Sequence, residues 1–343
     1  MGLCWASGVA LRSMGQRRQC FGGCMELIWI PITMFAALMQ AVRTAGQKTL
    51  NQNMSTLGTT YVRSLFGLPV MGVYLAALLA LGGYGVPAFS GQYFVHAALG
   101  ALAQVVATML LIYMFRLRNF VVGTMLTKSD ILMTAVIGGL FFSETLSGAG
   151  WLALLVVLSG VFLMLIGRLG IRLRRGAARF DGPGRDGETM RETLLGRPTQ
   201  VALTCALSFA FSYLFLREAM LDLGRGLDHG LPMWRGAWTV VVATGMQVAG
   251  LGLWLLVKER SIFSQIWRNR GIAGFIGVTS ALGSIGWYTA FAMQNASYVR
   301  AVGQIEAVFT LLISWAYFKE RISGLEFAGI LLTVTGVVIF RLL

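Results

Sequence analysis

Residues 119–147 read NFVVGTMLTKSDILMTAVIGGLFFSETLS, and residues 295–323 read NASYVRAVGQIEAVFTLLISWAYFKERIS. The two stretches align without a gap at a constant offset of 176 residues. This alignment superposes Asp130 on Glu306, and each of these acids lies deep inside an apolar run. A match of this length within one chain predicts an internal duplication.

The composition is that of a membrane protein. Of 343 residues, 56% are hydrophobic and only 12% are charged, and the mean hydropathy is +0.71. Such a chain does not fold around one aqueous core. A helix that crosses a bilayer needs about 20 mostly apolar residues. The sequence predicts ten such spans, at 28–48, 57–81, 90–115, 118–142, 147–167, 200–221, 232–257, 271–294, 296–318 and 323–342.

Asn119 opens the fourth span and Asn295 opens the ninth, so the duplicated unit contains five spans. An odd number of spans turns the second copy upside down relative to the first. The expected fold is therefore an all-α membrane protein with ten transmembrane helices in two inverted five-helix repeats. The expected domains are an N-terminal extension at 1–25, a first repeat at 26–167, an Arg-rich linker at 168–198 and a second repeat at 199–343.

Met25 directly precedes the first span, so the N-terminal extension is expected to reflect an upstream mis-start.

Lys and Arg gather in the connections that follow odd-numbered spans, above all in the Arg-rich linker. Because basic connections stay in the cytoplasm, this count places both chain ends outside. Most of the net charge of +14 is then explained by membrane topology, and no nucleic-acid partner is expected.

The joints FFSETLS at 141–147 and YFKERIS at 317–323 each close one span and open the next. On these residues, the chain resembles ten-helix members of the EamA-like branch of the drug/metabolite transporter superfamily over 26–343. The resemblance implies export or exchange of small metabolites through a central cavity between the halves. It also implies cytoplasmic chain ends, which disagrees with the count of basic residues. A bacterial inner membrane is the expected location, and a homodimer is left open.

Charges inside the spans are the best guide to function, because an ionisable group at bilayer depth is costly unless it faces a partner or water. Asp130 and Glu306 lie near mid-depth of the fourth and ninth spans. They can exchange protons during transport, or they can neutralise Arg63 and Arg235, which also form a repeat-related pair. Direct substrate binding is a third interpretation.

Lys128, Arg300 and Gln304 lie on corresponding faces of the fourth and ninth spans. If these faces point inward, they make a cationic lining that favours a carboxylate or phosphate on the substrate, as in an amino acid. For Arg300 the alternative is that its side chain extends from the first turn toward lipid headgroups.

The first span carries a polar stripe, and the eighth carries two adjacent aromatic residues. The stripe is expected to line the cavity or to bond neighbouring helices. The aromatic residues are expected to stack on the substrate or to belong to the core. The residues concerned are Gln40, Arg43 and Gln47 in the first span, and Trp287 and Tyr288 in the eighth.

The joints at 141–147 and 317–323 are expected to have a structural role. Glu144 and Glu320 sit in turns, where Ser147 and Ser323 can cap the helices that follow. The glycines of the eighth and tenth spans are expected to let neighbouring helices pack closely.

The sequence contains only two histidines and four cysteines, and it carries no His-Glu-x-x-His, Gly-x-Ser-x-Gly or phosphate-loop motif. No enzymatic activity, metal site or cofactor is predicted. The expected function is secondary active transport of a small metabolite by alternating access, with protons as the coupling ion and the bilayer as the second partner. A flippase for a lipid-linked phosphate or sugar is the alternative.

Overall fold

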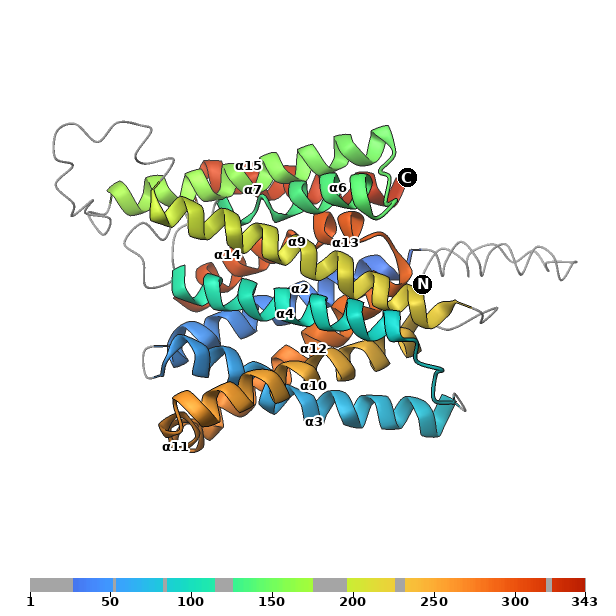
Figure 1. Ribbon diagram of the computed structural model, residues 1–343. Coiled ribbons are helices and arrows are strands. Elements are labelled where there is room, and N and C mark those ends of the chain that lie inside the picture. The colour runs from blue at the N-terminus through green and yellow to red at the C-terminus, as the bar shows by residue number, and fades with distance from the viewer. Residues whose placement is uncertain are drawn as a thin grey trace, which may run out of the picture.

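The computed structural model describes residues 27–51, 54–82, 85–114, 126–174, 196–225, 232–318 and 323–342 (Figure 1). Every element named in this part is an α-helix. Before the Arg-rich linker the helices are α2 (Trp29–Leu50), α3 (Thr56–Gly82), α4 (Gly91–Met114), α6 (Asp130–Phe141) and α7 (Gly148–Arg174). After it come α9 (Arg197–Gly224), α10 (Pro232–Lys258), α11 (Ser261–Arg268), α12 (Arg270–Met293), α13 (Ala296–Gly303), α14 (Ile305–Phe318) and α15 (Gly324–Leu342).

Each predicted span overlaps at least one of these helices. In the described part of the chain, six helices are long and apolar enough to cross a membrane, namely α3, α4, α7, α9, α10 and α12. Helix α6 and the Gly324–Phe340 part of α15 are shorter apolar helices. The prediction of an all-helical membrane fold is therefore supported, while the total of ten spans stays a prediction.

The predicted ninth span, 296–318, is wrong as a single helix, because α13 ends before Gln304 and α14 begins after it. The Gln304 N–H donates to Ala301 O at 3.2 Å, and Ala307 N–H donates to Gln304 O at 2.9 Å, so the backbone tightens into three-residue turns here. A similar turn precedes α6, where Ser129 N–H donates to Leu126 O at 3.1 Å. In the alignment of the two copies, these breaks fall at neighbouring positions.

Helices from opposite halves of the chain pack side by side and antiparallel. Helix α4 contacts α9 through His96 Nδ1 and Asp222 Oδ2, 2.7 Å apart, and through Cys205 Sγ and Ala107 O, 3.3 Å apart. Helix α3 contacts α10, where Ser64 Oγ donates to Gln247 Oε1 at 2.9 Å. Helix α2 packs against α12, and α7 lies along α15 (Figure 1). The two halves are therefore interleaved.

Glycines permit the closest of these contacts. A Cβ atom added to Gly329 of α15 would lie 2.6 Å from Gly160 O of α7, and one added to Gly160 would lie 2.6 Å from Thr333 N. One added to Gly277 of α12 would collide with Phe66 of α3. The predicted packing role is confirmed at Gly277 and Gly329. It is wrong for Gly271 and Gly274, where an added Cβ would meet nothing within 4 Å.

Both predicted serine caps are confirmed. Ser147 Oγ accepts the Gly150 N–H at 3.0 Å, and Ser323 Oγ accepts the Glu326 N–H at 3.1 Å. Glu326 Oε2 also accepts the Ser323 N–H at 2.7 Å, which completes a capping box at the start of α15.

Glu144 fastens the α6–α7 joint to the connection between α12 and α13. One carboxylate oxygen accepts the Ala296 N–H at 3.0 Å, and the other lies 2.5 Å from Arg217 Nε. Arg217 also donates to Phe291 O and Gln294 O, at 2.5 and 2.6 Å. An acid thus faces the N-terminus of α13 and a base faces the C-terminus of α12, which is the favourable arrangement for both helix dipoles. Glu320, the repeat-related acid, lies outside the described residues.

Candidate functional site

The two repeat-related acids both stand where a helix resumes after a break. Asp130 is the first residue of α6, and Glu306 is the second residue of α14. Each is followed one turn later by a threonine that donates its hydroxyl back to the acid's own carbonyl, Thr134 at 2.6 Å and Thr310 at 2.9 Å. The exposed N–H groups of a helix start favour a negative charge, so the breaks create suitable positions for carboxylates.

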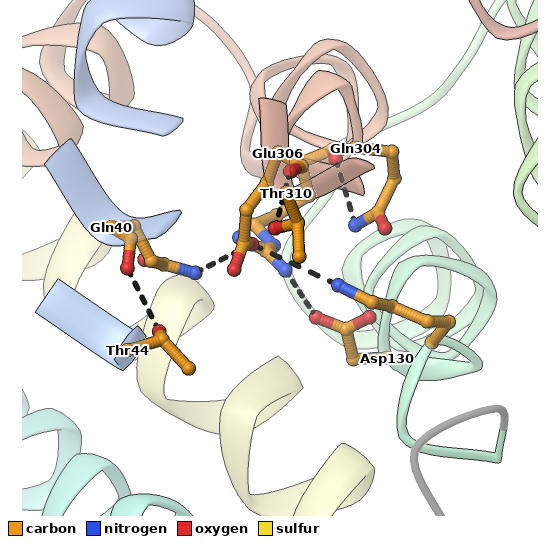
Figure 2. Close-up of polar contacts among 8 residues, drawn as sticks. Gln40, Thr44, Asp130, Gln304, Glu306 and Thr310 are labelled. Atoms are coloured by element: carbon orange, nitrogen blue, oxygen red, sulfur yellow. Dashed lines mark hydrogen bonds and ion pairs between the residues drawn. The ribbon is translucent and has the colours of Figure 1, made fainter. Parts of the chain in front are cut away.

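Asp130 pairs with Arg300 of α13 at the centre of the bundle (Figure 2). Arg300 NH2 lies 2.6 Å from Asp130 Oδ2, and the two side chains are only 4% and 3% exposed. The Arg300 guanidinium also faces the rings of Tyr213 and Trp287, at 4.4 and 5.1 Å from their centroids. The alternative in which Arg300 extends toward lipid headgroups is therefore wrong, because the bundle interior supplies both an acid and two aromatic faces.

Glu306 is held more loosely than Asp130. Its Oε2 accepts a hydrogen bond from Gln40 Nε2 of α2 at 2.8 Å, and Lys128 Nζ lies 3.8 Å from the same oxygen (Figure 2). The Glu306 side chain is 13% exposed. Gln40 of the predicted polar stripe and Lys128 of the predicted lining are thus brought together with one of the two acids.

Arg63 does not pair with either acid in the described part of the chain. Its guanidinium donates to the amide oxygens of Gln104 and Gln247, at 3.2 and 3.1 Å, and to Thr108 Oγ1 at 3.4 Å. Arg235 donates to the Ala292 carbonyl at 3.3 Å. The interpretation in which Asp130 and Glu306 neutralise Arg63 and Arg235 therefore does not hold, because uncharged oxygens accept the hydrogen bonds of both arginines. Arg300, which sequence reasoning placed in the lining, is the arginine that pairs with Asp130.

The other predicted residues are buried or half-buried around this network. Arg43 Nε, Gln47 Nε2 and Tyr288 OH are enclosed and have no hydrogen-bond partner among the described residues. Arg43 lies within electrostatic range of both Glu306 and Arg63. Trp287 and Tyr288 both belong to the buried core, which is one of the two alternatives for this pair, and Trp287 also contacts the Arg300 guanidinium.

Gln304 marks the break itself and is fully buried. Its amide nitrogen reaches the Arg300 carbonyl at 3.5 Å, and its amide oxygen has no partner in the described part of the chain. Gln304 therefore lies one helical turn from Arg300 and two residues before Glu306, and its predicted role in lining a cavity stays a prediction.

Sequence reasoning missed the neutral members of the site. Tyr213 lies under Arg300, and Gln104, Thr108 and Gln247 surround Arg63. Gln104 and Gln247 are amides inside long apolar helices, where an unpaired amide is unfavourable. A search for uncharged polar residues within the spans, and not only for charges, would have found them.

The sequence model described as the EamA-like transporter family matches residues 199–342. Over these residues the chain is similar to the EamA-like transporter family. The matched half contains the break at Gln304 and supplies Glu306, Arg300 and Tyr213 to the site.

The family is part of the drug/metabolite transporter superfamily, whose members span membranes. Together with the apolar helices of the described residues, this match supports an integral multi-pass membrane protein. Among the described residues, no group of three or more His, Cys, Asp or Glu side chains is arranged to hold a metal ion.

Solved structures are similar in fold to most of the chain. In all, 28 solved chains match. One is a crystal structure described only as that of a protein, with a TM-score of 0.62 and 14% sequence identity. The match covers 93% of this chain and 98% of that one, so the similarity in fold extends over both halves. None of the curated proteins matches the chain.

Proposed function

We propose that the protein is a secondary active transporter that exchanges protons for an anionic small metabolite by alternating access. The observation that carries this proposal is the central polar network, in which Asp130–Arg300 and Gln40–Glu306–Lys128 join helices of both halves at mid-bundle. Polar groups inside a spanning bundle are costly, and they persist where they bind a substrate or an ion.

The inverted repeat is supported by helix directions. Helices α7 and α15 occupy equivalent places in the two halves and run antiparallel, because Gly160 lies beside Gly329 while Gly167 lies beside Ser323. The equivalent helices α3 and α10 are antiparallel too, since Tyr61 lies beside Gly252 and Met71 beside Thr244. Equivalent helices that point in opposite directions are what an axis in the membrane plane requires.

The pairs of helices that contact each other are also equivalent in the two halves. The contact of α2 with α12 corresponds, after the halves are exchanged, to that of α9 with α4, and α14 with α2 corresponds to α6 with α9. This symmetry favours two arrangements of similar energy, related by movement of one half against the other. Alternating access requires two such arrangements.

The two acids are not equivalent as proton carriers. Asp130 makes a close ion pair with a fully buried arginine, so protonation would leave Arg300 without its counter-charge. Glu306 has a neutral amide as its nearest partner and a lysine at 3.8 Å. Protonation of Glu306 therefore disrupts less, and we assign the coupling role to Glu306 and a mainly structural role to Asp130.

Glu306→Gln is expected to abolish proton-driven flux in proteoliposomes while the protein stays folded, because glutamine keeps the hydrogen bond to Gln40 but cannot exchange a proton. The measurement is substrate flux with and without an imposed pH gradient. Lys128→Gln serves as the control, since it removes the loose cation and keeps the acid. Unchanged gradient-driven flux in Glu306→Gln would exclude this carboxyl as the coupling group.

The charge balance of the network supports an anionic substrate. Arg43, Arg63, Lys128 and Arg300 are the cations, and only Asp130 and Glu306 oppose them among the described residues in this part of the bundle. A buried arginine without an acid is costly. A substrate carboxylate or phosphate near Arg43 and Arg63 would supply the missing negative charge.

Arg63→Gln is therefore expected to weaken binding of the anionic substrate about tenfold or more, the usual cost of losing a charge-assisted hydrogen bond. Arg63→Lys keeps the charge and is expected to retain part of the affinity. The measurement is the dissociation constant, by thermal shift or calorimetry in detergent. Equal affinities in Arg63→Gln and the parent protein would remove this arginine from the site.

A ligand screen by thermal shift separates the two substrate classes. Stabilisation by amino acids or phosphorylated metabolites would support metabolite transport, whereas stabilisation only by long-chain isoprenoid phosphates would favour the flippase. A bacterial inner membrane, the export direction and a homodimer stay predictions.

A further inference from the structure

Helix α11 is a short helix that no apolar run in the sequence predicts, and it lies at the end of the bundle. It connects α10 to α12, two helices long enough to cross a membrane. Figure 1 shows α11 at one extremity of the bundle, seen nearly end-on while the long helices run across the picture. Helix α10 has 27 residues, about 40 Å, against a hydrocarbon thickness of about 30 Å, so its end reaches the headgroups.

One face of α11 is fixed to the bundle. Ile262 and Ile266 are buried against the ends of α2 and α3, in a cluster with Leu50, Tyr61 and Val62. Ile262 lies so close to Gly58 that a side chain there would collide with it. The acid of this segment, Glu259, is held inward by a hydrogen bond from Ser55 Oγ at 3.2 Å.

The other face is basic and aromatic. Lys258, Arg260, Arg268 and Arg270 are all exposed, and Glu259 is the single acid between residues 258 and 270. Trp267 is 69% exposed, which is unusual for a tryptophan. The Arg270 guanidinium lies over the Trp267 ring at 5.4 Å from its centroid.

We propose that α11 and the residues that flank it form an interfacial anchor. Arg260 before the helix, Arg268 at its end and Arg270 at the start of α12 bind anionic phospholipid headgroups, with Trp267 seated at headgroup level. A guanidinium matches a phosphate oxygen pair, and a tryptophan is stable at the interface because one end is apolar and the other can donate a hydrogen bond. Basic residues beside a spanning helix are attracted to anionic lipid, and the buried isoleucines keep α11 in the interface plane.

The test measures quenching of Trp267 by brominated lipid. The protein is reconstituted in phosphatidylcholine vesicles that contain either phosphatidylglycerol or phosphatidylcholine brominated near the headgroup end of one acyl chain. The Trp267 signal is the difference between the parent protein and Trp267→Phe. Brominated phosphatidylglycerol is expected to be preferred at least about fivefold at low salt, the effect of a single basic residue at an anionic surface.

The triple variant Arg260→Gln, Arg268→Gln, Arg270→Gln is expected to lose this preference, and the corresponding triple lysine variant to retain most of it. Arg225→Gln, at an exposed arginine directly after α9, is the control and is expected to keep the preference. Thermal unfolding in pure phosphatidylcholine checks that every variant is folded. Equal quenching by the two lipids in the parent protein, or a preference that survives in the triple glutamine variant, would overturn the proposal.

Discussion

Arg300→Met is expected to cost about 3–5 kcal/mol of stability, because it leaves the Asp130 carboxylate buried without its cation. The Asp130–Arg300 contact is 2.6 Å long, and both side chains are almost fully enclosed. Water cannot compensate the remaining charge there. The measurement is the free energy of unfolding from a detergent-driven unfolding titration.

The double variant Asp130→Leu, Arg300→Met is expected to recover much of the loss, because it removes both charges and keeps similar volumes. Lys128→Met is the matched control at the looser pair. With an N–O distance of 3.8 Å and a lysine side chain that is 23% exposed, that pair is expected to contribute about 1 kcal/mol or less. If the double variant is as unstable as the sum of the two single variants, Asp130 and Arg300 are not energetically coupled.

Gly329→Ala is expected to cost about 3 kcal/mol, at the upper end of the range for overpacked cores. The added Cβ would lie 2.6 Å from Gly160 O and 2.7 Å from Met164 N, and both are backbone atoms. No change of rotamer relieves such a contact, so α7 and α15 must separate along their shared face. The measurement is the midpoint of thermal unfolding in detergent.

Gly250→Ala provides the control with the opposite sign. Gly250 lies inside α10, where an added Cβ meets nothing within 4 Å. The same substitution there removes a flexible residue from a helix and is expected to stabilise the protein by about 0.5–1 kcal/mol. Equal unfolding midpoints for the two variants would show that α7 and α15 tolerate a wider spacing.

The sequence predicted the features that depend on hydropathy, on the internal repeat and on local spacing. The positions of α3, α4, α10 and α12 agree with the expected spans to within a few residues. The thickness of the bilayer sets the length of a spanning apolar run, so such runs are easily recognised. The duplication pointed to Asp130 and Glu306 as equivalent acids inside the spans, and each makes polar contacts between the two halves. The caps at Ser147 and Ser323 followed from local spacing.

Two kinds of feature left no mark in the sequence. The break at Gln304 is a change in backbone hydrogen bonding inside a stretch that is long enough for one span, so the length of the span does not reveal it. The partner of Asp130 is 170 positions away, so only the folded bundle selects Arg300 over Arg63 or Arg235. Both rejected arginines are satisfied by neutral oxygens, an option that a count of charges does not include.

The pairing of Arg63 with Gln247 has a consequence for biogenesis. Arg63 belongs to α3, whereas Gln247 belongs to α10 and leaves the ribosome 184 residues later. When α3 is synthesised, none of the three acceptors of Arg63 has yet been made. Gln104 and Thr108 follow with α4, whereas Gln247 is absent until α10 is synthesised. Until α10 inserts beside α3, the Arg63 guanidinium therefore lacks one of its hydrogen-bond acceptors.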